Sequence, residues 1–302
     1  MTHMVIDHSG VRNEVPLGPL TTYRVGGKAK WFAEPSDLEE LRSILRATPK
    51  TTEIAILGRG SNVVISDSGI DGLVLRLGGS FSAIDIRGDG AVVCGGALPL
   101  PQLARAAAAA GRSGLGFYVG IPGSVGGAVR MNAGGHGSDT AAVLTSAVVV
   151  DAKSGELSTR SLTDLALTYR SSNLGPTDVV AQATFHSQAG NVGDLEDEIR
   201  ETTQWRRDNQ PSGTFNAGSV FKNPPDQYSG AIIDSLGLKG TRIGPVRVSE
   251  IHANFMIADA NAGAMDIWKF VHTIQGIVNA RTGILLEPEI VFLGVFELEE
   301  EQ

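Results

Sequence analysis

The chain has little of what a secreted, metal-binding or membrane-spanning protein needs. Cys94 is the only cysteine, which excludes an internal disulfide and a cysteine-based metal site. The six histidines show no H-E-x-x-H spacing, so we expect no metal. No apolar stretch approaches the roughly 20 residues of a membrane span, and the N-terminal residues lack an apolar signal core. These absences predict a cytoplasmic protein with no membrane insertion.

Positive charge is also in short supply. The 25 basic residues stand against 33 acidic ones and give a net charge of −8. This balance argues against broad binding to nucleic acid or to an anionic membrane surface. It does not exclude an anionic small substrate, because a local cluster of arginines can outweigh the average field. A length of 302 residues predicts two or three domains.

Helical and extended patterns are mixed along the chain and predict an α+β fold. Short β-branched runs predict strands at residues 53–57, 63–66, 73–77, 91–94, 148–151, 179–185 and 289–295. Helices are expected after a capping box at residues 36–39, from Pro101 to Gly111, from Leu195 to Trp205, and through Ile267, Val271, Ile274 and Val278 to Gly283. The polar segment 187–194 is the expected linker, and we expect the tail, residues 297–302, to fray.

Glycine is the residue in excess, at 38 positions against a usual share of about 7%. It gathers in the turn at residues 58–62 and again through residues 120–135. Loops of small residues expose backbone N–H groups that can form an anion-binding nest. The first loop alone is equally well explained as a tight turn, whereas two such loops in one domain favour a cofactor site. Neither matches the G-x-G-x-x-G fingerprint, because Val63 stands where the third glycine belongs, and no phosphate loop with G-K-[ST] occurs. A Rossmann-type dehydrogenase is therefore disfavoured.

Seven motifs, in order from about residue 20 to residue 294, resemble those of the UDP-N-acetylenolpyruvoylglucosamine reductases (the MurB family). They are Thr22-Tyr23-Arg24-Val25-Gly26-Gly27; residues 57–62; Gly120-Ile121-Pro122-Gly123-Ser124-Val125-Gly126-Gly127-Ala128 with Met131-Asn132-Ala133-Gly134; Tyr169-Arg170-Ser171-Ser172; residues 216–224; His252-Ala253-Asn254-Phe255; and Leu286-Glu287-Pro288-Glu289. Any one would be weak, but seven in order are specific.

The resemblance implies a fold and a reaction. The fold is the FAD-binding, vanillyl-alcohol-oxidase-like (PCMH-type) one, with two α+β subdomains at residues 1–78 and 79–190 and a C-terminal α+β substrate domain at residues 191–302. Non-covalent FAD and NADPH are the implied cofactors, and the partner is a UDP-sugar enolpyruvyl ether. The implied role is peptidoglycan precursor synthesis. The short interval from Arg170 to Ser219 is similar to the subclass that lacks an inserted tyrosine loop.

Residue roles carry over from the matching motifs. Arg170 is the implied cation beside the substrate carboxylate, Glu289 helps to stabilise the intermediate, and Ser219 delivers a proton. The implied flavin contacts are Tyr23, Arg24, Gly58, Gly60, Ser61, Asn62, Gly120, Ile121, Pro122, Gly123, Ser124, Gly126, Gly127, Asn132, Ala133 and Gly134. The expected substrate contacts are Lys222, Asn223, Arg206 and Arg207.

Plainer interpretations stand beside these roles. Taken alone, Arg170 is a surface ion pair, Glu289 a solvated charge and Ser219 a turn residue. The pair Arg206 and Arg207 is equally explained as a solvated helix end. On the same scaffold the chain could be an FAD-linked alcohol oxidase or a non-catalytic flavin or nucleotide-sugar binding protein, because fold alone does not fix function.

Four positions depart from the family pattern: Arg59 where glycine is common, Arg130 where an aromatic residue is common, His136, and Ile251 in place of lysine. They leave the chemistry intact and bear on how the flavin is contacted. We expect His252 and Asn254 to be structural. The sequence does not determine the oligomeric state.

Overall fold

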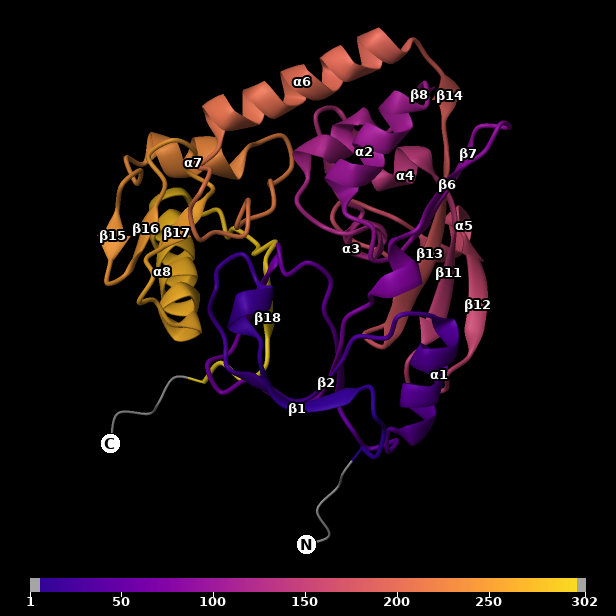
Figure 1. The fold of residues 1–302 in the computed structure, drawn as a ribbon. Helices are drawn as coiled ribbons and strands as arrows, with labels where there is room; N and C mark the ends of the chain where they lie inside the picture. Colours follow the sequence, from indigo (N-terminus) through magenta and orange to yellow (C-terminus); the bar gives the residue numbers. More distant parts are fainter. Residues whose placement is uncertain (1–5, 298–302) are drawn as a thin grey trace, which may run out of the picture. The chain divides into compact units, whose positions relative to one another are not determined.

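The structure, a computed structural model, describes residues 6–297. These form two units, each assembled from three separate stretches of chain, and Figure 1 shows the elements of both. Unit 1 contains residues 6–14, 30–59 and 71–206, and unit 2 contains residues 15–29, 60–70 and 207–297. The division at residues 78 and 190 stays a prediction. The expected frayed tail lies outside the described residues from position 298 onward.

The first sheet has the strand order β1-β2-β5-β3, with β3 and β5 parallel. Its strands are β1 (Val11–Pro16), β2 (Lys28–Ala33), β5 (Ile70–Leu75) and β3 (Ile54–Ile56). Helix α1 (Leu38–Ala47) buries the apolar face Leu41, Ile44 and Leu45. The expected strands near residues 53–57 and 73–77 are thereby confirmed, as is the helix.

The cap of α1 differs from the expected box by one residue. Asp37, not Ser36, is the N-cap, and its carboxylate accepts a hydrogen bond from Glu40 N. The Glu40 carboxylate in turn accepts from the backbone N and hydroxyl of Ser36, both at 2.7 Å. These bonds lower the pKa of Glu40. The capping box at residues 36–39 was therefore wrong in register, because two neighbouring residues could each cap the same helix.

The second sheet is antiparallel and has the order β12-β11-β13-β7-β6. Its strands are β12 (Leu157–Ser161), β11 (Leu144–Asp151), β13 (Asp178–His186), β7 (Ala91–Gly95) and β6 (Ile84–Ile86). Helices α2 (Leu100–Ala109) and α3 (Val125–Met131) pack against it with the cluster that contains Val92, Ala183 and Phe185 (Figure 1). Val179 and Ala181 of β13 instead join the cluster of the first sheet, so this strand is buried on both faces.

The remaining elements of unit 1 are short: β8 (Arg112–Ser113), β9 (Gly134–Gly135), β10 (Ser138–Asp139), α4 (Thr140–Val143), α5 (Leu162–Leu165), β14 (Gln188–Ala189), and the 3-10 turns Gly79–Ser82 and Gly116–Gly120. A third 3-10 turn, Gly18–Leu20, belongs to unit 2. The expected linker is not an open loop. Its strand β14 pairs with β8, and α6 (Val192–Asn209) begins inside it. Backbone pairing thus orders a segment that its polar composition predicted to be a linker.

Unit 2 is built around helix α8 (Ala264–Thr282). This helix buries the expected stripe of Ile267, Val271, Ile274 and Val278 and ends at Gly283, whose φ is 74°. Around it lie an antiparallel sheet, α7 and a parallel pair: β15 (Arg242–Ile243), β16 (Val246–Val248), β17 (Met256–Ala258), α7 (Ser229–Ser235), and β18 (Val291–Leu293) beside β4 (Val63–Ile65). The pairing of β18 with β4 brings two segments that are more than 200 residues apart in the chain into register.

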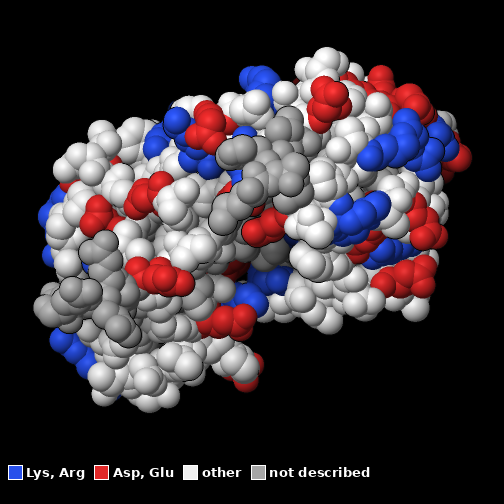
Figure 2. All heavy atoms as spheres, turned by 90° about the horizontal axis from the view of Figure 1, so that it is seen from below, with Lys and Arg blue, Asp and Glu red and all other residues white. Residues whose placement is uncertain are grey.

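Acidic and basic side chains alternate over the face shown in Figure 2, and neither sign covers it alone. Ion pairs occur among the described residues, as between Lys30 and Asp71 and between Arg76 and Glu34. In the part of the chain that the structure describes, no helix combines the length and the apolar content that crossing a membrane requires. Cys94 lies in the core of unit 1, and burial raises the pKa of its thiol to about 12, which keeps it protonated.

Candidate active site

The two glycine-rich loops meet within unit 1. A Cβ added to Gly58 would lie 2.9 Å from the hydroxyl oxygen of Ser124, which is too close for a real side chain. Gly58 is nevertheless exposed, so its bare backbone can be approached by a ligand. Ser124 caps α3 by accepting a hydrogen bond from Gly127 N. The loops therefore form one cradle that a side chain would fill, and this fits a bound cofactor.

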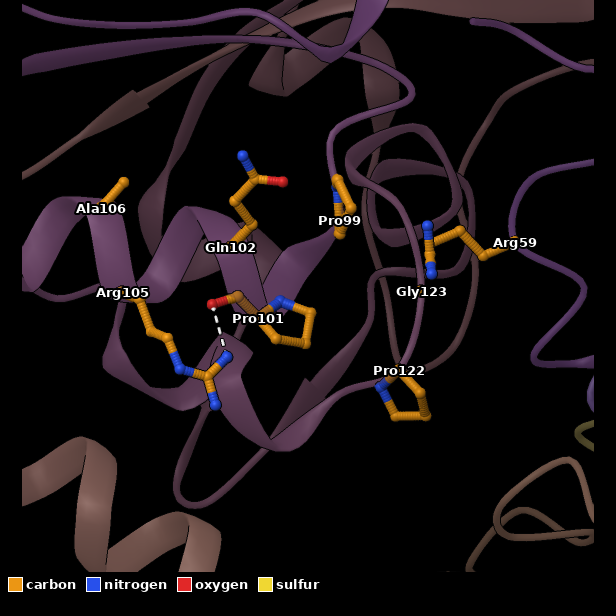
Figure 3. Close-up of a pocket in the computed structure, with 8 residues that line it drawn as sticks. All are labelled: Arg59, Pro99, Pro101, Gln102, Arg105, Ala106, Pro122 and Gly123. Atoms are coloured by element: carbon orange, nitrogen blue, oxygen red, sulfur yellow. Dashed lines mark hydrogen bonds between the residues drawn. The ribbon is translucent and has the colours of Figure 1, made fainter. Parts of the chain in front are cut away.

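A cavity of about 620 Å³ opens beside this cradle (Figure 3). The first loop contributes Arg59 and the second contributes Pro122 and Gly123. The remaining lining residues belong to the start of α2: Pro99, Pro101, Gln102, Arg105 and Ala106. Sequence reasoning identified Pro122 and Gly123 but missed the α2 residues. The signal was a lone arginine, Arg105, in an otherwise alanine-rich helix.

Asn132 has a structural role that its motif did not reveal. Its side chain is buried, donates to Asp139 at 3.1 Å and to Thr168 O at 2.9 Å, and accepts from Ala141 N at 2.9 Å. The amide thus ties the β9–β10 hairpin to the turn that carries Arg170. Any contact of Asn132 with a flavin would have to come from its backbone.

Arg170 lies directly beside this part of the second loop. Its guanidinium donates to Gly134 O at 3.0 Å and lies 5.0 Å from the ring centroid of Tyr169. Its backbone has a positive φ of 54°, a strained conformation for a non-glycine residue. Among the described residues seven non-glycine positions have positive φ, and Arg24, Asn132 and Arg170 are three of them. The positive φ of Arg170 and its bond to Gly134 O give this arginine a defined position, which favours a functional role over a surface ion pair.

The remaining expected catalytic residues come together in unit 2. Ser219 forms a β-bridge with Phe255. The next residue, Val220, accepts a hydrogen bond from Glu289 N at 2.7 Å. The Asn62 amide, from the first glycine-rich loop, donates to Glu289 O at 3.0 Å. Residues from four of the seven motifs are thereby joined by main-chain and amide hydrogen bonds, although they span most of the chain.

Lys222 and Asn223 continue this segment. The Lys222 ammonium pairs with Glu287 at 2.5 Å, which offsets its charge in this structure. Its carbonyl accepts from the Ser229 hydroxyl, and Asn223 Oδ1 accepts from Ser229 N at 3.0 Å. Both residues therefore help to begin α7.

Tyr23 and Arg24 form a turn within unit 2. Tyr23 is buried and its hydroxyl donates to Met256 O at 3.0 Å, while burial raises the pKa of the phenol. The Arg24 guanidinium donates to Pro19 O at 2.8 Å. Tyr23 thus serves the core of unit 2.

Gly60 approaches the backbone of Leu20 closely. A Cβ added to Gly60 would lie 2.2 Å from Leu20 O, so this close approach of two backbones requires glycine.

The two arginines of α6 differ in exposure. Arg206 is half-buried, and burial lowers the pKa of its guanidinium, whereas Arg207 is exposed. His136, whose ring is 5.1 Å from that of Trp205, has a lowered pKa because of partial burial and the charge of Arg206. Arg206 thus belongs to a cluster with aromatic neighbours, a setting that a freely solvated helix end would not have.

Sequence comparisons bear on the whole chain. An FAD binding domain matches residues 29–160, and the C-terminal domain of UDP-N-acetylenolpyruvoylglucosamine reductase matches residues 210–293. The reductase 2 of Symbiobacterium thermophilum is 39% identical over 96% of this chain and 94% of its own length. A reductase of the same name from Synechococcus sp. strain RCC307 is 41% identical over 95% of both chains.

A solved structure agrees with these relatives. The crystal structure of the reductase from Thermus caldophilus has a TM-score of 0.82 and 33% identity, and the match covers 94% of this chain and all of that one. The expected α+β, FAD-binding fold is confirmed by this likeness and by the match to the FAD binding domain.

Proposed function

The chain belongs to the UDP-N-acetylenolpyruvoylglucosamine reductases, a family of oxidoreductases, and on that premise we propose its reaction and residue roles. The reaction is the reduction of UDP-N-acetyl-3-O-(1-carboxyvinyl)glucosamine to UDP-N-acetylmuramate, with NADPH as hydride source and non-covalent FAD as mediator. It would take place in the cytoplasm as a step of peptidoglycan synthesis. Cell-wall biogenesis, cell shape and cell division would depend on it.

The observation that carries this proposal is the joining of Ser219, Glu289 and Asn62 in unit 2. Main-chain hydrogen bonds hold Glu289 beside the residue that follows Ser219, because Val220 O accepts from Glu289 N at 2.7 Å and the Asn62 amide donates to Glu289 O. A serine hydroxyl and a glutamate carboxyl carried on backbone fixed in this way suit a proton transfer and the stabilisation of a charged intermediate.

The chemistry divides between the cofactor and the chain. When bound by the two glycine-rich loops, FAD would supply the hydride chemistry for reduction at the methylene carbon of the enolpyruvyl group, with NADPH as the hydride source. Ser219 would give its hydroxyl proton to the neighbouring carbon and regain a proton from solvent, so that the C=C bond becomes a C–C bond with one hydride and one proton added. Glu289 stabilises the intermediate by hydrogen bonding to the substrate carboxylate, which requires the protonated carboxyl form at that moment.

Arg170 supplies the positive charge. Negative charge accumulates on the substrate carboxylate and the adjacent carbon as hydride arrives, and a guanidinium stabilises that state more than the ground state. The hydrogen bond from Arg170 to Gly134 O supports this role, because it orients the arginine from a loop expected to contact the flavin. The proposed flavin contacts are those of the two glycine-rich loops with Tyr23 and Arg24.

Substrate binding is assigned to four residues. We assign Lys222 and Asn223 to the sugar and Arg206 and Arg207 to the diphosphate, where a planar guanidinium can make paired hydrogen bonds. The half-buried position of Arg206 supports its assignment. Without a nicotinamide-binding Rossmann module, the preference for NADPH over NADH follows from the family alone.

NADPH oxidation by the purified yellow protein, with and without the enolpyruvyl substrate, tests the proposal. We expect oxidation that depends on the substrate, with release of intact FAD on heating. Peroxide formation with an alcohol substrate would identify an oxidase instead. A protein that binds flavin but consumes no NADPH with the substrate would be a binding protein.

A further inference from the structure

The cavity beside the two glycine-rich loops is positively charged. Its eight lining residues include two arginines, Arg59 and Arg105, and no acidic residue. Three prolines and Ala106 form much of the remaining wall. A cavity with cations and no carboxylate favours a ligand group that carries negative charge.

The two arginines are held differently. The Arg105 guanidinium turns back along its own helix and donates to Pro101 O at 3.2 Å. Arg59 extends from its loop toward Gly123, as Figure 3 shows. Among residues 6–297 no carboxylate or carbonyl oxygen pairs with Arg59, and its side chain is exposed. A guanidinium without a partner beside a cavity is available to bind an anion.

The position of Arg59 makes it more than a surface charge. It follows Gly58, whose backbone lies against Ser124, and it faces Gly123 of the second loop. The Arg59 guanidinium adds to the backbone donors of the loop a planar cation that can make two hydrogen bonds to a phosphate.

We propose that Arg59 binds the diphosphate of FAD in this cavity and so determines how tightly, and with what salt dependence, this chain holds its cofactor. This inference rests on the proposed use of FAD. The diphosphate is the only anionic part of FAD, and the lining contains no aromatic side chain against which a flavin or adenine ring would stack. Arg105 adds long-range charge, but its hydrogen bond to Pro101 limits direct contact.

The test measures release of FAD from the diluted holoenzyme, by the fluorescence that free flavin regains, over a range of NaCl concentrations. Variants are Arg59→Gly, Arg59→Lys, Arg105→Gln and, as a control of equal charge on α1, Arg46→Gln. Because Arg59 is exposed, its replacement leaves folding intact, which thermal unfolding of each variant checks.

We expect Arg59→Gly to raise the dissociation constant of FAD about tenfold at low salt. In the unchanged protein, affinity should fall as NaCl rises from about 50 to about 500 mM, and Arg59→Gly should remove most of that dependence. Arg59→Lys should keep the salt dependence and lose part of the affinity. Arg105→Gln should have a smaller effect, and Arg46→Gln none.

Equal weakening by Arg59→Gly and Arg46→Gln would mean that only net charge matters, and unchanged affinity in Arg59→Gly would mean that no anion lies in the cavity. Either result overturns the inference while leaving the reaction untouched, since the readout involves neither NADPH nor substrate. Failure of the unchanged protein to retain any flavin would instead overturn the proposed function.

Discussion

Asn254 holds the main chain of Phe221 at both of its polar groups. Its Oδ1 accepts from Phe221 N at 3.0 Å and its Nδ2 donates to Phe221 O at 2.8 Å. The backbone of Asn254 also accepts from Val220 N at 2.8 Å. Because Asn254 is buried, these bonds fix the segment that follows Ser219 without competition from water.

Replacing Asn254 therefore tests how that segment is held. Asn254→Leu keeps the approximate volume but leaves Phe221 N and O buried without partners, at a cost of about 2–4 kcal/mol. Asn254→Asp keeps the acceptor and should cost less. Urea unfolding measures both, with Asn13→Leu on an exposed position of β1 as control. Equal stability of Asn254→Leu and the unchanged protein would show that water replaces the amide.

Ser219→Ala separates the two half-reactions. Flavin reduction by NADPH needs no proton from this hydroxyl and should proceed at nearly the original rate. Reoxidation by the enolpyruvyl substrate should slow by about a hundredfold or more. Anaerobic stopped-flow at the flavin absorbance band times both steps. Ser219→Cys retains an ionisable proton and should be faster than alanine. If alanine slows both steps equally, Ser219 is structural and Glu289 becomes the first candidate for the proton donor.

Arg170 is tested by changing its shape and its charge separately. Arg170→Lys keeps one positive charge but loses the planar guanidinium with its paired N–H donors, and Arg170→Ala removes both the charge and the donors. Alanine should raise the barrier of substrate reduction by about 2–4 kcal/mol, and lysine by less. Flavin content is measured in parallel, because the bond to Gly134 O is also lost. Small and equal effects of the two changes would return Arg170 to a surface role.

Gly58→Ala tests the contact of the two loops. The added Cβ would lie 2.9 Å from Ser124 Oγ, so either the Ser124 hydroxyl leaves its capping position on α3 or one loop shifts, at a cost of about 1–3 kcal/mol. We expect reduced flavin content after purification. Adding Ser124→Ala to the same chain removes the clashing oxygen and should recover part of the flavin. Normal flavin content in Gly58→Ala alone would remove this contact from the cofactor site.

The lowered pKa of His136 predicts how its contribution to stability depends on pH. Partial burial and the charge of Arg206 lower its pKa, so the imidazole is uncharged at pH 7. The unfolded chain then binds this proton more readily than the folded one, and the contribution of His136 to stability falls as pH drops below about 6.5. Arg206→Gln should raise the pKa of His136, measured by NMR titration, while Arg207→Gln leaves it nearly unchanged. An unaltered value in Arg206→Gln would remove this arginine as a cause.

The sequence by itself determined the elements whose signal is local. The apolar stripe of α8 with Gly283 at its end appears as expected, because a 3.6-residue period and a left-handed glycine are fixed by neighbouring residues. The same holds for the short β-branched strands and for the ordered series of motifs that identified the family. These signals need no knowledge of distant contacts.

Only the tertiary structure decided how those segments use their polar groups. The choice of Asp37 over Ser36 as cap and the pairing of β14 with β8 depend on which partners lie nearby after folding. The cavity that joins Arg59 to α2 and the bonds from Asn254 to Phe221 connect residues 33 or more positions apart. A hydrogen bond of that kind leaves no local pattern, because its donor and acceptor are ordinary residues until the chain brings them together.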